Sequence, residues 1–134
     1  MTTISILDAS DEEDYTVFLH KSRESMLFHS MPYKRVLQDF LLAKPFYIIA
    51  REKDKILGAI PAFLKENKEY GNVINSLPFI GSNGGVIVDS SLDYMEKLRI
   101  KKELLNAFQL LATEEDCILS TIITSPFDRD VIFY

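Results

Sequence analysis

The chain has 134 residues, of which 47% are hydrophobic and 26% charged, as in an ordinary globular domain with its own core. Fifteen basic and twenty acidic residues give a net charge of -5, which argues against a protein that coats DNA or RNA. The single cysteine, Cys117, excludes an internal disulfide and a cysteine-based zinc site. The sequence shows neither a signal peptide nor an apolar run near the ~18 residues of a membrane span, so we expect a cytoplasmic protein without a transmembrane segment.

The first part of the chain predicts a strand over residues 3–7 and then two helices. Ser10 and Glu13 have the spacing of a capping box, so the first helix is expected over residues 11–24. Ser30 can cap the second helix. Its apolar residues form the clearest helical repeat in the chain: Tyr33, Val36, Leu37, Phe40 and Leu41.

Segments rich in β-forming residues follow the second helix. Residues 46–51 and 56–64 flank a polar turn and predict an antiparallel hairpin. Pro61 cannot donate to a strand ladder and predicts a bulge or an edge at that point. Residues 72–77 are expected to return as a third strand.

A long helix is expected next, capped by Ser90 and Asp93 and ending near Thr113, before a last strand over residues 117–124. The residues predicted for its inner face are Tyr94, Leu98, Leu105, Phe108, Leu111 and Ala112. The resulting order, β-α-α-β-β-β-α-β, describes a single α+β domain over residues 1–134. Residues 131–134 are apolar, which fits either a last strand or docked tail, or a truncated chain.

The loop Gly81-Ser82-Asn83-Gly84-Gly85 is one candidate binding element. Its backbone N–H groups could cradle a phosphate, but the spacing matches neither the dinucleotide-binding nor the Walker pattern. The alternative is a wide hairpin or bulge that needs positive φ at the glycines, and the sequence fits this interpretation better.

Basic residues and a histidine near the start of the second helix form another candidate. Lys34 and Arg35 add positive charge where a helix dipole favours anions, although the sequence alone favours the interpretation that they lie on a solvated helix face. His29 could be a general base or a phosphate contact, or it could bond the backbone between two helices. The two histidines lack partners at ligand spacing, so no metal site is expected. Residues 128–130 have the composition of an exposed turn.

Several segments resemble Fem-type aminoacyltransferases and related GNAT-like proteins. Residues 28–33 (FHSMPY) resemble their F-H/Q-S-x-x-W entry to the second helix, with Tyr33 in place of tryptophan. Residues 46–64 resemble their hairpin with a G-x-x-P-x-F-L second strand, and residues 76–85 resemble their S-L-P-F/Y … G-G segment. The element order resembles the first two-thirds of the GNAT acyltransferase fold, a mixed, mostly antiparallel sheet flanked by helices.

The resemblance implies an activity. Such relatives carry two GNAT-like halves and transfer an acyl or aminoacyl group to an amine of a cell-envelope precursor, so this chain matches a first half. The donor implied is aminoacyl-tRNA or acyl-CoA. Residues 89–92 (DSSL) replace the Q/R-x-x-G-x-G/A loop that holds CoA in single-half relatives, so conventional acetyl-CoA binding is disfavoured, and no cofactor and no general base are identified.

Two hypotheses follow. In the first, the chain is a GNAT-like acyltransferase, or its N-terminal half, in which Tyr33, Lys34, Arg35 and the loop residues Gly81, Asn83, Gly84 and Gly85 contact an amine acceptor and its phosphates. In the second, it is a non-catalytic module that pairs with itself as a homodimer, or with a partner such as a second GNAT-like half, through its last strand and residues 131–134.

Overall fold

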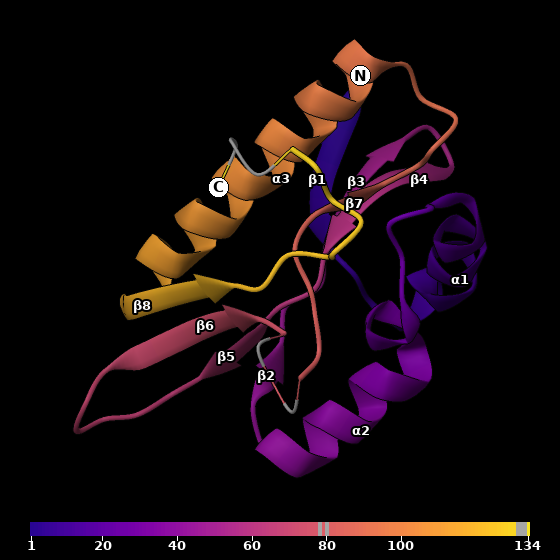
Figure 1. Ribbon diagram of the computed structural model, residues 1–134. Coiled ribbons are helices and arrows are strands. Elements are labelled where there is room, and N and C mark those ends of the chain that lie inside the picture. The colour runs from indigo at the N-terminus through magenta and orange to yellow at the C-terminus, as the bar shows by residue number, and fades with distance from the viewer. Residues whose placement is uncertain (78, 80, 131–133) are drawn as a thin grey trace.

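The computed structural model describes residues 1–77, 79, 81–130 and 134 (Figure 1). Its helices are α1 (Glu12–Lys21), α2 (Met31–Leu41) and α3 (Tyr94–Glu114), and short 3-10 turns occupy Ala9–Asp11 and Leu27–His29. Its strands are β1 (Thr2–Ile6), β2 (Lys44–Pro45), β3 (Ile48–Glu52), β4 (Lys55–Ile60), β5 (Phe63–Lys65), β6 (Asn72–Ser76), β7 (Ile87–Val88) and β8 (Cys117–Ile122). The predicted α+β class is confirmed. The strand predicted over residues 46–51 begins two residues later, as β3, and the strand predicted over residues 56–64 is divided into β4 and β5.

The described strands form two four-stranded sheets, in the orders β1-β3-β4-β7 and β2-β5-β6-β8. The break between β4 and β5 falls at Pro61 and Ala62, which confirms the interruption predicted from the missing proline N–H. The named strands pair antiparallel except for β6 and β8, which pair in parallel from Asn72↔Cys117 to Ser76↔Ile122. A parallel pair needs a long crossover, and α3 provides it.

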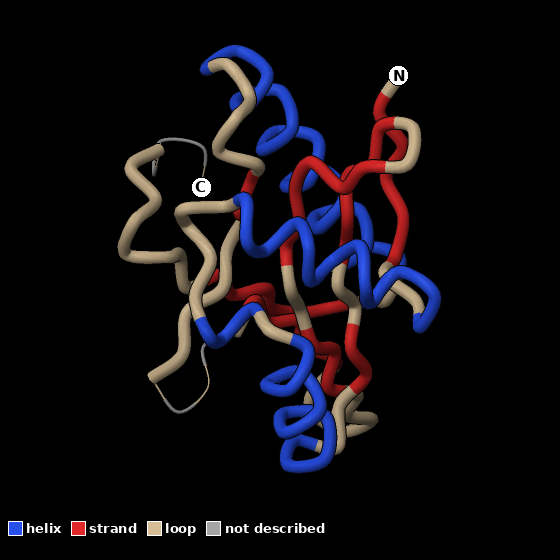
Figure 2. Tube along the Cα trace, turned by 90° about the vertical axis from the view of Figure 1, so that its right-hand side faces the viewer, coloured by secondary structure: helices blue, strands red, loops and turns tan. Residues whose placement is uncertain are grey.

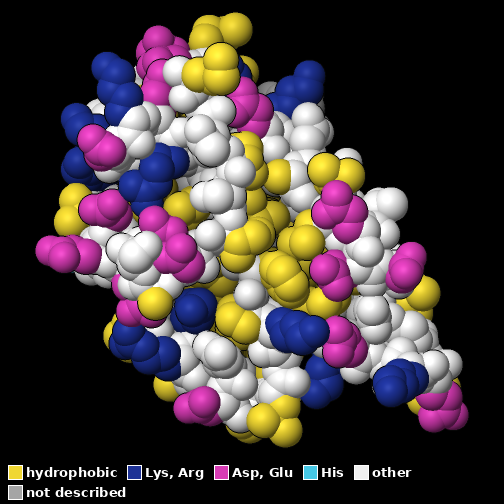
Figure 3. All heavy atoms as spheres, turned by 180° about the vertical axis from the view of Figure 1, so that it is seen from behind, with side chains coloured by type: hydrophobic (Ala, Val, Ile, Leu, Met, Phe, Trp, Pro, Cys, Tyr) yellow, Lys and Arg dark blue, Asp and Glu magenta, His cyan; other side chains and the backbone are white. Residues whose placement is uncertain are grey.

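Helices cover both faces of the strands, as Figure 2 shows from the side of α1 and α2. Alternate residues of β3 and β4 therefore enter two different clusters. Ile48 and Ile60 pack with α3 residues such as Leu104, while Ile49 and Ala59 pack with residues of α1 and α2. Strands buried on both faces carry near-continuous apolar runs, which is why these segments do not alternate. From behind, hydrophobic side chains remain visible across the middle of the molecule (Figure 3).

The start of α1 differs from the prediction. Asp8 and Asp11 form the capping box, on the turn that precedes α1, and the predicted pair Ser10 and Glu13 does not. Asp8 is well placed because its Oδ1 accepts the Ser10 N–H at 2.7 Å. Helix α1 ends at Lys21, three residues before the predicted end.

The caps of α2 and α3 agree better with the sequence. Ser30 Oγ accepts the Tyr33 N–H at 3.4 Å, and Asp93 Oδ1 accepts the Glu96 N–H at 2.9 Å. Ser90, the other predicted cap of α3, instead accepts the N–H of Arg23 at 2.8 Å and so ties α1 to the loop before α3. Tyr94 was predicted on the inner face of α3 but is 64% exposed, because it lies in the first turn, beyond the end of the sheet.

Two further expectations concern the chain as a whole. None of the helices in the described part of the chain is both long and apolar enough to cross a membrane. Of the segment predicted at residues 131–134, only Tyr134 lies within the described residues, so a last strand there stays a prediction.

Because Leu104 is fully buried between α3 and the strands, we expect Leu104→Ala to lower the free energy of unfolding by about 2–5 kcal/mol. Leu110→Ala is the matched control on the same helix, since Leu110 is 59% exposed and should change stability by about 0.5 kcal/mol or less. Urea unfolding followed by circular dichroism measures both. Equal effects of the two substitutions would contradict the placement of α3.

Candidate functional site

Strands β6 and β8 run side by side and then separate, which creates the most promising place for a ligand. After Ser76↔Ile122 the chains meet once more at an isolated parallel bridge, Gly84↔Thr124, and β7 then continues along β4. In sheets with parallel strands, ligands commonly bind beyond the carboxyl ends, where neighbouring strands diverge. We call this place the β6–β8 junction and define it by Ser76, Gly84–Val86 and Thr124.

The glycine loop closes one side of the junction. Gly84 donates its N–H to the Ile123 carbonyl at 2.6 Å, and Gly85 donates to Ser76 Oγ at 2.9 Å. A Cβ on Gly84 would lie 2.5 Å from the Ser76 carbonyl oxygen, so only glycine allows this approach. The two N–H groups serve the chain itself, which supports the bulge interpretation over a phosphate cradle.

The other predicted members of the loop differ in their surroundings. Gly81 and Gly85 have φ of 75° and 76°, as the bulge interpretation requires. Asn83 donates its side-chain N–H to the Thr124 carbonyl at 2.8 Å and so helps to hold the junction together. Gly81 is exposed and a Cβ there would meet nothing within 4 Å, so it can contact a ligand only at the rim.

His29 joins the turn before α2 to this loop. Its Nδ1 accepts the Met26 N–H at 3.0 Å, which leaves the proton on Nε2 to be donated to the Gly84 carbonyl at 3.3 Å. Burial lowers the pKa of His29 to about 4, so the ring is neutral at pH 7. Of the two roles considered for this residue, backbone bonding between elements is the one that the structure shows.

The three predicted residues of α2 lie in two different places. Lys34 Nζ lies 5.7 Å from the centre of the Tyr47 ring. Tyr33 packs edge-on against Phe28, with their ring centres 5.4 Å apart. Tyr33 belongs to the cluster between α2 and the strands, which Phe79 of the loop also joins, and Lys34 lies near Tyr47 of the same cluster. Arg35 instead forms an ion pair with Glu12 on the exposed surface.

Tyr47 is a residue that the sequence did not single out. Its side chain is almost fully buried, and its hydroxyl has no hydrogen-bond partner among the residues that the structure describes. Burial raises the pKa of this hydroxyl well above its usual value. A buried hydroxyl without a partner costs free energy, but this one has almost no exposed surface and is out of reach of a ligand in this arrangement. In sequence it is one aromatic residue in an apolar strand, and nothing there distinguishes it.

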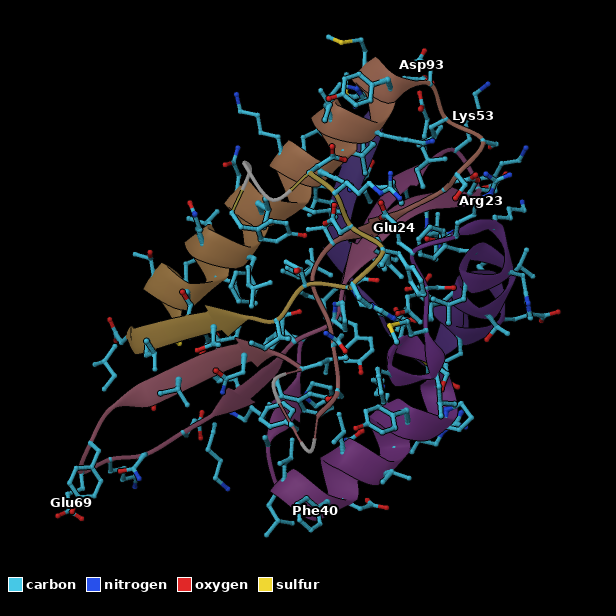
Figure 4. All side chains as sticks on the ribbon, in the orientation of Figure 1. Arg23, Glu24, Phe40, Lys53, Glu69 and Asp93 are labelled. Carbon is cyan, nitrogen blue, oxygen red and sulfur yellow. The ribbon has the colours of Figure 1, made fainter. Side chains whose placement is uncertain are left out.

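A buried ionic cluster lies on the other side of β7, and the sequence missed it as well. Lys101 Nζ lies 2.9 Å from Asp128, 3.0 Å from Asp130 and 3.0 Å from Glu24. Figure 4 shows Glu24 beside the segment that follows β8. The prediction of an exposed turn over residues 128–130 is wrong for Asp128, whose side chain is fully buried.

The electrostatics of this cluster follow from burial and pairing. Burial opposes the charge on Lys101, but the hydrogen bonds that its ammonium donates to the three carboxylates more than offset this effect and raise the Lys101 pKa. Burial raises the pKa of Glu24 despite its bond to Lys101. The oxygens of the three carboxylates lie within 4.8 Å of one another, a spacing that could suit a metal ion. In this structure the Lys101 ammonium is the cation that they bind.

A pocket of about 700 Å³ opens beside the loop between β7 and α3. Its basic lining residues are His20, Lys21, Arg23 and Lys55. Carboxylates of the loop already bind its backbone N–H groups: Asp89 Oδ1 accepts the Ser91 N–H at 2.8 Å, and Asp93 accepts the Glu96 N–H. Arg23 and Asp93 are both labelled in Figure 4. The positive charge therefore comes from side chains at the end of α1, in the segment after it and at the start of β4, not from the start of α3.

Comparison with known proteins agrees with this architecture. No family model and no curated protein matches the sequence. Among solved structures, a ribosomal-protein-alanine N-acetyltransferase from Brucella melitensis biovar Abortus 2308 shares 13% identity at a TM-score of 0.69, over 100% of this chain and 88% of that one.

Two further structures are similar. An aminoglycoside acetyltransferase from an uncultured soil metagenomic sample, in complex with sisomicin, shares 18% identity at a TM-score of 0.65, covering 98% of this chain and 82% of its own. A GNAT family acetyltransferase from Staphylococcus aureus shares 14% identity at a TM-score of 0.61, and the match covers 92% of this chain and 86% of that one. At these identities the likeness shows the fold alone, and that fold is the one GNAT acetyltransferases have.

The neutral state of His29 makes stability depend on pH. Below pH 6.5 the unfolded chain binds a proton at this ring, whereas the folded chain excludes it down to about pH 4, so stability falls as the pH falls through this window. Between about pH 6.5 and pH 4, we expect protonation of His29 to lower the free energy of unfolding by at most about 1.4 kcal/mol per pH unit.

Urea unfolding at pH 7, 6, 5 and 4.5 tests this expectation. His29→Gln should flatten the pH dependence, while His20→Gln, at an exposed position on α1, should leave it as in the wild type. An unchanged slope in His29→Gln would show that His29 is not held neutral.

Proposed function

We propose that the chain is an N-acyltransferase, or the N-terminal half of one, that transfers an acyl or aminoacyl group to an amine. The observation that carries the proposal is the β6–β8 junction, where two parallel strands joined by α3 diverge beside a glycine loop within a GNAT-type fold. Likeness to several acetyltransferases supports it. The Fem-like segments over residues 28–33, 46–64 and 76–85 favour a cell-envelope precursor as the acceptor.

The acceptor side is proposed to lie between α2 and the glycine loop. Tyr33 and Lys34 from α2, which are partly buried, offer contacts to a polar, amine-bearing molecule. The loop residues Gly81, Asn83, Gly84 and Gly85 shape the facing wall. Arg35 points to Glu12, so it would reach only an extended acceptor. The sisomicin complex of the soil enzyme is an example of such an acceptor in a similar fold.

The donor is proposed to place its phosphates in the basic pocket near Arg23. Acyl-CoA and aminoacyl-tRNA both carry phosphates, and the positive side chains of the pocket suit either. The start of α3 is a poor substitute for a glycine-rich phosphate loop, because Asp89 and Asp93 already occupy its N–H groups with their own carboxylates.

The chemistry itself is a single displacement. The amine nitrogen attacks the acyl carbonyl, a C–N bond forms, and the bond to the thiol or to the tRNA hydroxyl breaks while the amine loses a proton. Among the described residues near the junction, neither His29 nor Asp128 is free to accept this proton. Both ring nitrogens of His29 are hydrogen-bonded to the backbone, and Asp128 is paired with Lys101. The proton would therefore leave through water, and positioning would supply most of the rate.

The proposal is tested by an acyl-transfer assay in which acetyl-CoA and alanyl-tRNA are separate donor arms and a panel of amines serves as acceptors. We expect the double substitution Lys21→Glu and Arg23→Glu to raise the donor KM by roughly tenfold or more, because it reverses two charges in the pocket. Lys68→Glu, in the exposed turn between β5 and β6, is the matched charge control and should change little. A folded chain that neither transfers from nor binds either donor would refute the proposal in both of its forms.

One observation favours the second candidate function, a binding module that associates through β8. This strand ends the order β2-β5-β6-β8, so its outer edge has no partner among the described residues. Ile118 and Leu119 on it are 69% and 57% exposed. An open apolar edge of this kind is a template for pairing with another chain.

If β8 pairs with a second copy, light scattering at micromolar concentrations should give the mass of a dimer. Leu119→Lys should then return the chain to a monomer, because an edge lysine opposes strand addition. Val36→Lys, at a similarly exposed position on α2, is the control and should leave the dimer intact. A monomeric wild type would exclude this mode of association.

A further inference from the structure

Strands β6 and β8 turn one row of side chains away from α3, beside the β6–β8 junction. Side chains alternate along each strand, so Ile74 and Ile122 pack toward α3, whereas Asn75 and Thr121 point to the opposite face. Asn75 pairs with Thr121 on β8 and with Phe63 on β5, which places these three side chains in one row across the sheet. The row lies one residue before the last pair at which β6 and β8 run together.

This row is polar at its centre and apolar around it. Asn75 and Thr121 are partly exposed, and Leu119 and Ile123, two residues before and after Thr121, are 57% and 40% exposed. An amide and a hydroxyl side chain can each donate and accept hydrogen bonds, which suits a peptide group of a ligand. Neither β6 nor β8 carries a charged residue. We call Phe63, Asn75 and Thr121, with Leu119 and Ile123, the open face.

A cation lies at the α2 end of the open face. Lys34 Nζ lies 5.7 Å from the centre of the Tyr47 ring, and that ring packs edge-on against Phe63, with ring centres 5.8 Å apart. Lys34 is therefore connected to the row through two aromatic rings that pack between α2 and the sheet. Its side chain is partly exposed, so its ammonium is accessible to a ligand on this side of the sheet.

The charge of Lys34 is not compensated within the described part of the chain. Lys34 forms none of the ion pairs found there, whereas its neighbour Arg35 is paired with Glu12. Lys65, the cation on β5, donates instead to the carbonyls at the end of α2. The first turn of α2 contains no acidic residue, and this end of a helix is already positive, so an anion beside Lys34 is favoured.

We propose that the open face selects amine acceptors that carry one carboxylate, with Lys34 binding the carboxylate and Asn75 and Thr121 binding a peptide-like amide between it and the amine. The inference rests on the proposed function, because it takes the acceptor to lie beside the junction. Two strand spacings of about 4.8 Å separate Phe63 from Thr121, and an extended tripeptide spans about 10 Å, so a short peptide matches the row. A polycation such as sisomicin would meet Lys34 and no acidic residue of β6 or β8.

An NMR titration of the chain with trialanine and with trialanine amide tests the selection without any transfer. The amide should bind roughly tenfold or more weakly, because it lacks the charge that pairs with Lys34. In Lys34→Met, which keeps the apolar stem, the two peptides should bind equally, and Lys34→Arg should restore the difference. Lys68→Met, in the exposed turn between β5 and β6, is the matched control and should bind as the wild type does. Trialanine that fails to bind, or that binds no better than its amide or than sisomicin, would overturn the inference.

A second pair of variants tests which face of β8 is used. Thr121→Val should weaken the binding of both peptides several-fold, because it removes the hydroxyl and keeps the shape of the side chain. Ser120→Ala is the control on the same strand, since Ser120 faces the other way, beside Gln109 of α3, and should not affect binding. Equal effects of the two substitutions would overturn the assignment of the open face.

The transfer assay separates this inference from the proposed function. Acylation of trialanine amide and sisomicin as readily as trialanine would overturn the selection while the proposed function stands. Selective binding of trialanine by a chain that neither transfers from nor binds acetyl-CoA or alanyl-tRNA would refute the proposed function and leave the open face as a peptide-binding site.

Discussion

The parallel pairing of β6 with β8 is the interaction on which the arrangement of this protein depends. Two parallel strands cannot be joined by a tight turn, so α3 must run back across the sheet between them. The helix can do so because Ile100, Leu104 and Phe108 pack against the strands along its middle turns. The pairing also fixes where β8 ends, and with it the point at which the glycine loop and the following segment meet.

Close packing at that point leaves room only for particular residues. Gly84 must lack a side chain because the Ser76 carbonyl lies where its Cβ would be, and Ser76 in turn donates to the Pro61 carbonyl at 2.6 Å. One serine therefore links the break in the sheet to the glycine loop. His29 adds a third element by bonding Gly84 from the turn before α2. A neutral histidine suits this role because a charged ring would be costly to bury.

Charge is distributed unevenly around β7. On one side, exposed basic groups surround an open pocket, and on the other a single buried ammonium holds three carboxylates. Buried ion pairs contribute little net stability, because desolvation offsets much of the attraction. Such pairs instead fix the positions of the residues that form them. Each Asp128 oxygen accepts a hydrogen bond from a distant residue, one from Lys101 and the other from Tyr134.

The sequence alone determined the local features of the fold. The helix α2, the cap at Asp93 and the strand break at Pro61 depend on residues a few positions apart, and the structure confirms them. The predicted apolar face of α2 is confirmed only in part, because Val36 and Phe40 are 60% and 69% exposed. It was less reliable where neighbours compete, as at Ser10, where Asp8 makes the stronger cap.

Tertiary structure decided what depends on residues far apart in the chain. The pairing of Lys101 with Glu24 spans 77 positions and that of His29 with Gly84 spans 55, so no periodicity or spacing can reveal them. The free hydroxyl of Tyr47 is likewise visible only once its surroundings are known. Local structure follows from short-range sterics and hydrogen bonding, whereas the candidate site arises from burial, which only the packed chain defines.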